Sequence, residues 1–122
     1  MNNNDALPPI KCEMTDPRGK QIILFEDTWD IHIQEGHPEM EGHLNDVVTT
    51  IENPDWIREG RNTETEELYV KVKTRSKLEF TGTLAATRMI DGKMVIMTTA
   101  YEGNDSKHKG KMKWSKSKGE LL

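Results

Sequence analysis

The sequence predicts an α+β domain in which two helices precede an antiparallel sheet and cover one of its faces. Three observations support this prediction. Apolar residues recur with helical spacing as far as Asn53-Pro54, they alternate along residues 68–101, and Asp91-Gly92, a pair typical of tight hairpin turns, lies within the alternating region. The chain has 122 residues, which is the size of one domain.

The first elements expected are a strand and a helix. The run KQIILF at residues 20–25 predicts a short buried strand. Asp27 or Thr28 can then cap a helix that Gly36 ends. Three apolar residues in this segment also alternate as in a strand, which keeps that interpretation open: Trp29, Ile31 and Ile33.

A second helix is predicted just before Pro54. Its apolar residues follow the three-and-four spacing of a single buried stripe: Leu44, Val47, Val48 and Ile51. The helix must end at Asn53, because the residue before a proline avoids the helical conformation.

Three strands are expected after Pro54, along residues 68–73, 78–87 and 94–101. If Asp91-Gly92 and Arg75-Ser76 are two-residue turns, Gly82 lies between Tyr69 and Tyr101, and Thr99 lies opposite Leu84. This register predicts one polar face: Tyr69, Lys71, Lys73, Thr99 and Tyr101. The other face is then apolar: Leu68, Val70, Val72, Ile96 and Ala100. Gly82 would leave a floor for a substrate, or simply room for the two tyrosine rings.

Composition limits the cellular setting. Cys12 is the only cysteine, which excludes an intrachain disulfide and a cysteine-based zinc site. The start, MNNNDALPP, has no secretory-signal pattern, and no apolar run approaches the roughly 20 residues of a membrane span. We expect a cytoplasmic protein that does not associate with membranes. Three segments are expected: a partly flexible N-terminal segment (1–19), a folded domain (20–102) and a basic, partly ordered tail (103–122).

The net charge of −4 is unevenly distributed along the chain. Residues 103–122 carry six lysines and two acidic residues, a net charge of +4, whereas the first 102 residues carry 11 basic and 19 acidic residues, a net charge of −8. A basic tail on an acidic body can attract a polyanion through counterion release. A lysine-rich terminus can equally be a solvated end without a partner.

Two histidines, His32 and His37, lie five positions apart in the segment TWDIHIQEGHPEM. Imidazole exchanges protons near neutral pH. The pair therefore suits RNA cleavage without a metal, in which a base takes the proton of the 2′-hydroxyl and an acid protonates the leaving 5′-oxygen. Structural roles are the alternative, since His37 can bridge a helix connection before Pro38 and His32 can lie half buried beside Trp29.

No metal or other cofactor is expected. His43 and Glu39 are the residues that could join these two histidines in a metal site. Spacings of five and six residues do not place the histidines on one helical face, as the four-residue spacing of a helical zinc motif does.

Several short motifs follow one another along the chain: W-x-x-H-I-x-x-x-H-P-E-M from Trp29, V-V-T-T-I-E-N-P-D from Val47, E-L-Y-V from Glu67 and T-A-Y from Thr99. In order and spacing they resemble the phage-associated nuclease family grouped with barnase, EndoU, colicin and RelE toxins (the BECR fold). The similarity covers residues 22–101, and K-G-x-x-x-W from Lys109 can extend it.

The resemblance implies a barnase/RelE-like α+β fold, with N-terminal helices packed on one face of a curved antiparallel sheet and an RNase site on its exposed concave face. It makes four matched positions candidate catalytic residues: His32, His37, Thr99 and Tyr101. The face argument and nearby positive charges add candidate substrate-binding residues: Lys71, Tyr69, Arg58 and Arg61.

We therefore expect a metal-independent endoribonuclease, toxin-like or phage-associated, with residues 20–102 as the nuclease domain. RNA is the expected substrate, and a cognate inhibitor or antitoxin protein is a candidate partner. The alternative is a noncatalytic module that binds nucleic acid or protein. The acidic body also fits a regulatory protein that pairs with a basic partner.

Overall fold

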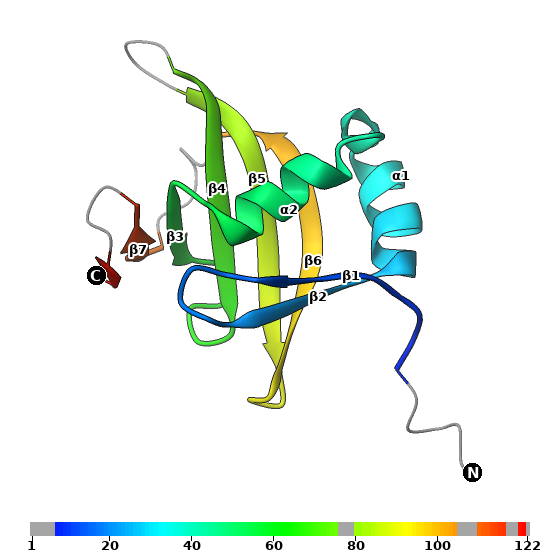
Figure 1. The fold of residues 1–122 in the computed structure, drawn as a ribbon, viewed down its shortest axis with the longest axis horizontal. Coiled ribbons are helices and arrows are strands. Elements are labelled where there is room, and N and C mark those ends of the chain that lie inside the picture. The colour runs from blue at the N-terminus through cyan, green and yellow to red at the C-terminus, as the bar shows by residue number, and fades with distance from the viewer. Residues whose placement is uncertain (1–6, 76–79, 105–109, 117–119, 122) are drawn as a thin grey trace.

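The computed structural model describes residues 7–75, 80–104, 110–116 and 120–121. They form one eight-stranded sheet in the order β1-β2-β6-β5-β4-β3-β7-β8, with helical segments on one side (Figure 1). The strands are β1 (Ile10–Thr15), β2 (Gln21–Phe25), β3 (Trp56–Glu59), β4 (Glu66–Arg75), β5 (Phe80–Ile90), β6 (Met94–Gly103), β7 (Met112–Ser115) and β8 (Glu120–Leu121). The helical segments are η2 (Thr28–Ile33), α1 (Gln34–Gly36), η3 (Pro38–Met40) and α2 (Leu44–Glu52).

An N-terminal hairpin opens the fold. Strands β1 and β2 are antiparallel, and their turn contains Gly19 at φ 91°, a conformation that glycine adopts without strain. Strand β2 then pairs with β6 in parallel, but only through Ile22 and Ile23. In Figure 1 the hairpin runs across the direction of β4, β5 and β6.

The helical layer confirms two local predictions. Trp29 and Ile33 are 4% and 0% exposed whereas Ile31 is 46% exposed, so residues 28–36 are helical rather than a strand. Helix α2 ends at Asn53, as predicted, and it lies across β4 and β5 (Figure 1).

Apolar side chains form a cluster on each side of the sheet. The larger cluster joins the helical segments to the sheet and includes Trp29, Ile33, Val47, Ile51, Tyr69 and Met97. The smaller cluster lies on the opposite face, which we call the outer face, and contains Leu68, Val70 and Leu84 with Trp56, Ala86 and Tyr101 packed against them.

The predicted sheet register was wrong. Tyr69 pairs with Ala85, three positions from the expected Gly82, because β4 continues to Arg75 and pairs there with Phe80. A shift by an odd number of residues moves every side chain of a strand to the other face. The Asp91-Gly92 turn does form, with positive φ at both residues.

The strand pair that follows this turn is also displaced. Thr99 pairs with Ala86 and Tyr101 with Leu84, two positions from the prediction, since the loop has three residues and a bulge follows in β6. Gly82 is not a substrate floor. A Cβ at this position would overlap the Lys71 carbonyl oxygen, so Gly82 allows β4 to approach closely.

The predicted fold class was also wrong. The helices do not form an N-terminal layer on an antiparallel sheet, because β1 and β2 precede them and β2 joins the sheet in parallel. A mixed eight-stranded sheet dominates the structure. Strand β1 lies within residues 1–19, and β7 and β8 lie within residues 103–122, whereas three lysines of the basic tail lie outside the described residues: Lys107, Lys109 and Lys118.

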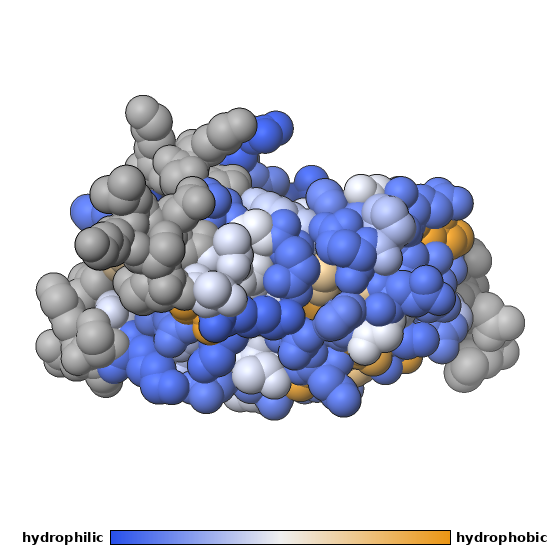
Figure 2. Space-filling model, turned by 90° about the horizontal axis from the view of Figure 1, so that it is seen from above, coloured by the Kyte–Doolittle hydropathy of each residue, from blue (hydrophilic) through white to orange (hydrophobic). Residues whose placement is uncertain are grey.

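The surface seen from above in Figure 2 is mostly hydrophilic, and its apolar side chains form small separate patches. In the described part of the chain, no helix combines the length and apolar character needed to cross a membrane.

Candidate functional site

A hollow of about 320 Å³ opens on the outer face of the sheet. It is bounded by the neighbouring strands β4, β5 and β6 and by the loop between β3 and β4. Its lining includes Arg61, Leu68, Ala86, Thr98, Thr99 and Tyr101. Ligand pockets usually enclose about 300–1,000 Å³, so the hollow has room for one small ligand.

Side-chain size explains the shape of the hollow. One row across β3, β4, β5 and β6 consists of Trp56, Val70, Leu84 and Tyr101. The adjacent row consists of Arg58, Leu68, Ala86 and Thr99. Ala86 and Thr99 are smaller than Leu84 and Tyr101, so the second row forms the floor and Tyr101 forms a wall.

His37 reaches this wall from the helical layer. It lies between α1 and η3, and its imidazole stacks on the Tyr101 ring with a centroid separation of 5.2 Å and an interplanar angle of 26°. The contact is possible because β2 pairs with β6 only near Val95 and Ile96. The later part of β6 is therefore adjacent to η2 and η3 instead of another strand.

Glu39 connects the same helical turn to β6. Its carboxylate accepts a hydrogen bond from the Glu102 backbone amide at 3.4 Å, and Oε2 lies 3.7 Å from His37 Nδ1. These contacts hold the His37 ring beside Tyr101 with Nδ1 toward a carboxylate. Nε2 has no hydrogen-bond partner among the described residues, so it can meet a ligand.

Two polar groups at the hollow can also bind a ligand. Within the described ranges, neither the Arg61 guanidinium nor the Thr99 hydroxyl is engaged in a hydrogen bond or ion pair. The Thr98 hydroxyl instead donates to the Ala86 carbonyl at 3.3 Å. Arg58 lies at the far end of the floor and donates to the Gly110 carbonyl at 3.2 Å.

The structure brings together five of the eight predicted site residues. His37, Thr99, Tyr101 and Arg61 lie at or beside the hollow, and Arg58 lies in its floor row. His32 is exposed on η2 and does not line the hollow. Tyr69 and Lys71 belong to the helix-covered face, because the true register of β4 and β5 reverses the predicted one.

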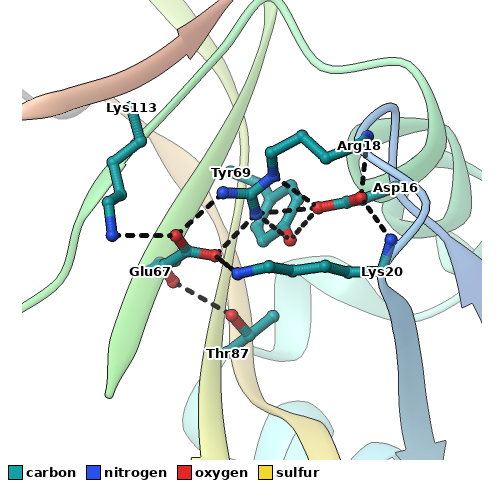
Figure 3. Close-up of polar contacts among 7 residues, drawn as sticks. All are labelled: Asp16, Arg18, Lys20, Glu67, Tyr69, Thr87 and Lys113. Atoms are coloured by element: carbon teal, nitrogen blue, oxygen red, sulfur yellow. Dashed lines mark hydrogen bonds and ion pairs between the residues drawn. The ribbon is translucent and has the colours of Figure 1, made fainter. Parts of the chain in front are cut away.

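Tyr69 instead belongs to a buried ionic network that sequence reasoning missed (Figure 3). Its hydroxyl donates to Asp16 at 2.7 Å. Arg18 donates to Asp16 at 2.7 Å, to both oxygens of Glu67 at 2.6 and 3.0 Å, and to the Tyr69 hydroxyl at 3.0 Å. Lys20 and Lys113 lie within 3.6 and 3.5 Å of Glu67.

The network explains the shifted pKa values of Glu67 and Tyr69. Burial alone would raise the pKa of Glu67, but hydrogen bonds and charge from Arg18 lower it. Burial and the nearby Asp16 charge raise the pKa of Tyr69, which keeps its hydroxyl protonated. Because its groups bond one another, we interpret the network as structural. The only sequence signal was the Asp16-Pro17-Arg18-Gly19 turn pattern.

Among the residues that the structure describes, one group of side chains has suitable metal-ligand atoms: His43, Asp46 and Glu102. The Lys73 ammonium lies between the carboxylates, 3.0 Å from Asp46 and 2.9 Å from Glu102. Hydrogen bonds from His43 and Lys73 lower the pKa of Asp46. Lys73 already neutralises these acids, so we assign the group a structural role between α2 and the sheet.

Comparison of the chain with protein-family models, curated proteins and solved structures finds no match. The nuclease resemblance of the short motifs therefore stays a prediction, and function must be argued from the geometry of the hollow.

Proposed function

We propose that the protein is a metal-independent endoribonuclease whose site is the hollow on the outer face. The observation that supports this most directly is the His37 ring stacked on Tyr101, beside a floor that ends at Thr99. The sequence resemblance to phage-associated nucleases covers the same histidine, threonine and tyrosine.

The reaction needs one proton acceptor and groups that stabilise the negative charge of the pentacoordinate phosphorus in the transition state. His37 takes the proton of the 2′-hydroxyl as this oxygen attacks the adjacent phosphorus. The bond from phosphorus to the 5′-oxygen breaks, a 2′,3′-cyclic phosphate forms, and the 5′-oxygen takes a proton from water. Arg61 and Thr99 donate to the phosphate oxygens as charge develops on them.

The distribution of charge supports RNA binding on the outer face. Residues 26–52, which form the helical layer, contain eight acidic residues and no lysine or arginine. The outer face and the loop beside the hollow carry three arginines, Arg58, Arg61 and Arg88, and two acidic residues, Glu64 and Glu66. A polyanion is therefore repelled by the helical side and meets a less acidic, arginine-bearing surface on the side with the hollow.

A cleavage assay tests the proposal. Purified protein is incubated with mixed cellular RNA in EDTA, and the new 3′ ends are analysed for 2′,3′-cyclic phosphate. We expect His37→Ala to slow cleavage by about 10²- to 10⁴-fold, the usual contribution of a positioned proton acceptor.

His32→Ala is the matched control, because it removes an exposed histidine of η2 that, unlike His37, does not stack on Tyr101. This variant should cleave at the wild-type rate. Intact RNA with the wild-type protein, or equal activity in the two variants, would contradict the proposed mechanism.

A noncatalytic RNA-binding module is the second candidate, and one observation favours it. Acid and base catalysis generally uses two proton-transfer groups, yet only one of the two predicted histidines is beside the hollow. Binding of RNA by the wild-type protein without any new RNA ends would identify this function.

A further inference from the structure

We infer that the hollow binds one unpaired RNA base, so that the protein selects single-stranded RNA with little preference for base type. The inference rests on the proposed function for its choice of RNA as the ligand. It follows from the shape of the hollow, from the polar groups that remain free in it, and from the way bases are stacked in a duplex.

The shape suits a flat ring. The Leu68 and Ala86 side chains form an apolar floor, and the Tyr101 ring on β6, with His37 stacked against it, forms an aromatic wall. Every base has an apolar face that can lie against such surfaces, which makes stacking tolerant of sequence. The volume of about 320 Å³ limits the occupant to about one nucleotide unit.

The free polar groups recognise phosphate better than base edges. Thr98 and Glu66 already make hydrogen bonds within the protein. The Thr98 hydroxyl donates to the Ala86 carbonyl, and Glu66 Oε1 accepts from the Asn62 amide at 2.9 Å. In the described part of the lining, Arg61 and Thr99 are left to bind a ligand. Both can donate to phosphate oxygens, which are the same in every nucleotide.

A duplex does not present the required surface. Both faces of a paired base are covered by its stacked neighbours, so a base enters the hollow only after it is unpaired and turned out of the helix. Single-stranded RNA avoids most of that cost. Duplex RNA of the same sequence should therefore bind more weakly.

Binding to a noncleavable probe tests the inference separately from cleavage. A fluorescent oligonucleotide with 2′-O-methyl groups throughout is titrated with protein, both single-stranded and annealed to its complement, and the dissociation constants are measured by anisotropy. Ala86→Leu places a larger side chain in the hollow. We expect it to weaken single-strand binding roughly 5- to 150-fold, the range found when a stacked base loses its platform.

Thr49→Leu is the matched control, since it adds an equally large apolar side chain at an exposed position of α2 that is not part of the hollow, and it should bind as the wild type does. Thermal unfolding checks that Ala86→Leu folds. If it does not fold, Tyr101→Leu replaces it, because this change removes the aromatic wall and keeps an apolar side chain. Wild-type single-strand affinity in the folded variant, or equal affinity of the wild-type protein for duplex and single strand, would overturn the inference.

The two proposals fail in different ways. Selective single-strand binding without cleavage of unmodified RNA rejects the nuclease and keeps the base site. Cleavage of duplex and single strand at equal rates keeps the nuclease and rejects the base site.

Discussion

Arg18 holds two carboxylates together inside the protein. Its side chain is 9% exposed, and its guanidinium lies 2.7 Å from Asp16 and 2.6 Å from Glu67. Removal of an ion from water costs several kcal/mol, and the short, charged hydrogen bonds offset this cost. Without the guanidinium, two carboxylates would face each other with little access to solvent.

We expect Arg18→Met to lower the free energy of unfolding by about 3–5 kcal/mol, measured by urea denaturation. Lys20→Met is the matched control, because Lys20 is 38% exposed and lies 3.6 Å from Glu67. Exposed ion pairs contribute about 0–1 kcal/mol. Equal losses in the two variants would show that Arg18 is not the centre of the network.

The lowered pKa of Glu67 predicts how stability depends on pH. An unfolded glutamate titrates at about pH 4.3, and the folded carboxyl titrates below its usual range. Its contribution is therefore complete above the unfolded pKa and disappears as pH falls through the folded value. We expect the melting-temperature difference between wild type and Glu67→Gln to shrink as pH falls from 7 to 3. A constant difference would contradict this assignment.

Among the secondary-structure elements, β7 shows why the basic tail cannot be treated as an appendage. It pairs with β3, and Trp114 packs against the larger apolar cluster. Near its start the Glu59 backbone amide donates to the Lys111 carbonyl, and the Lys111 amide donates to the Glu59 carboxylate. Lys113 lies 3.5 Å from Glu67. Removal of the tail would therefore remove part of the sheet as well as positive charge.

We expect deletion of residues 110–122 to lower the melting temperature and to unmask β3 as a sheet edge, measured by calorimetry and by aggregation. The double change Lys111→Gln and Lys116→Gln is the control, because both lysines are exposed and surface changes usually alter stability by less than about 0.5 kcal/mol. A deletion variant as stable as this control would show that β7 contributes little.

The long strands and α2 were predictable because their signals are local. The apolar stripe of α2 and the alternation in β4 and β6 lie within single segments. Strand β1 was missed although Ile10, Cys12 and Met14 alternate, since no run of strongly apolar residues marks it. Strand β7 was missed because its four residues lie in a lysine-rich stretch without an apolar run, in which Trp114 was the one residue that indicated ordered structure.

Across the whole molecule, the net charge of −4 is spread unevenly over the surface. The helical layer carries the eight acidic residues of 26–52 and no lysine or arginine, whereas the outer face carries Arg58 and Arg88 together with Glu66. An acidic protein can therefore still offer an arginine-bearing face to a polyanion, because screening limits electrostatic attraction to distances of about 8–10 Å at physiological salt. For the approach of a polyanion, the position of the charges on the surface therefore matters more than the net charge of the protein.

The sequence by itself determined the local elements, the Asp91-Gly92 turn and the uneven charge, because each depends on residues close together in the chain. Only the tertiary structure decided which side chains meet. A three-residue displacement of β4 against β5 moved Tyr69 and Lys71 away from Tyr101, and the short β2–β6 pairing left room for His37 rather than His32 beside that ring. Register and long-range pairing depend on packing of the entire sheet, which no local pattern encodes.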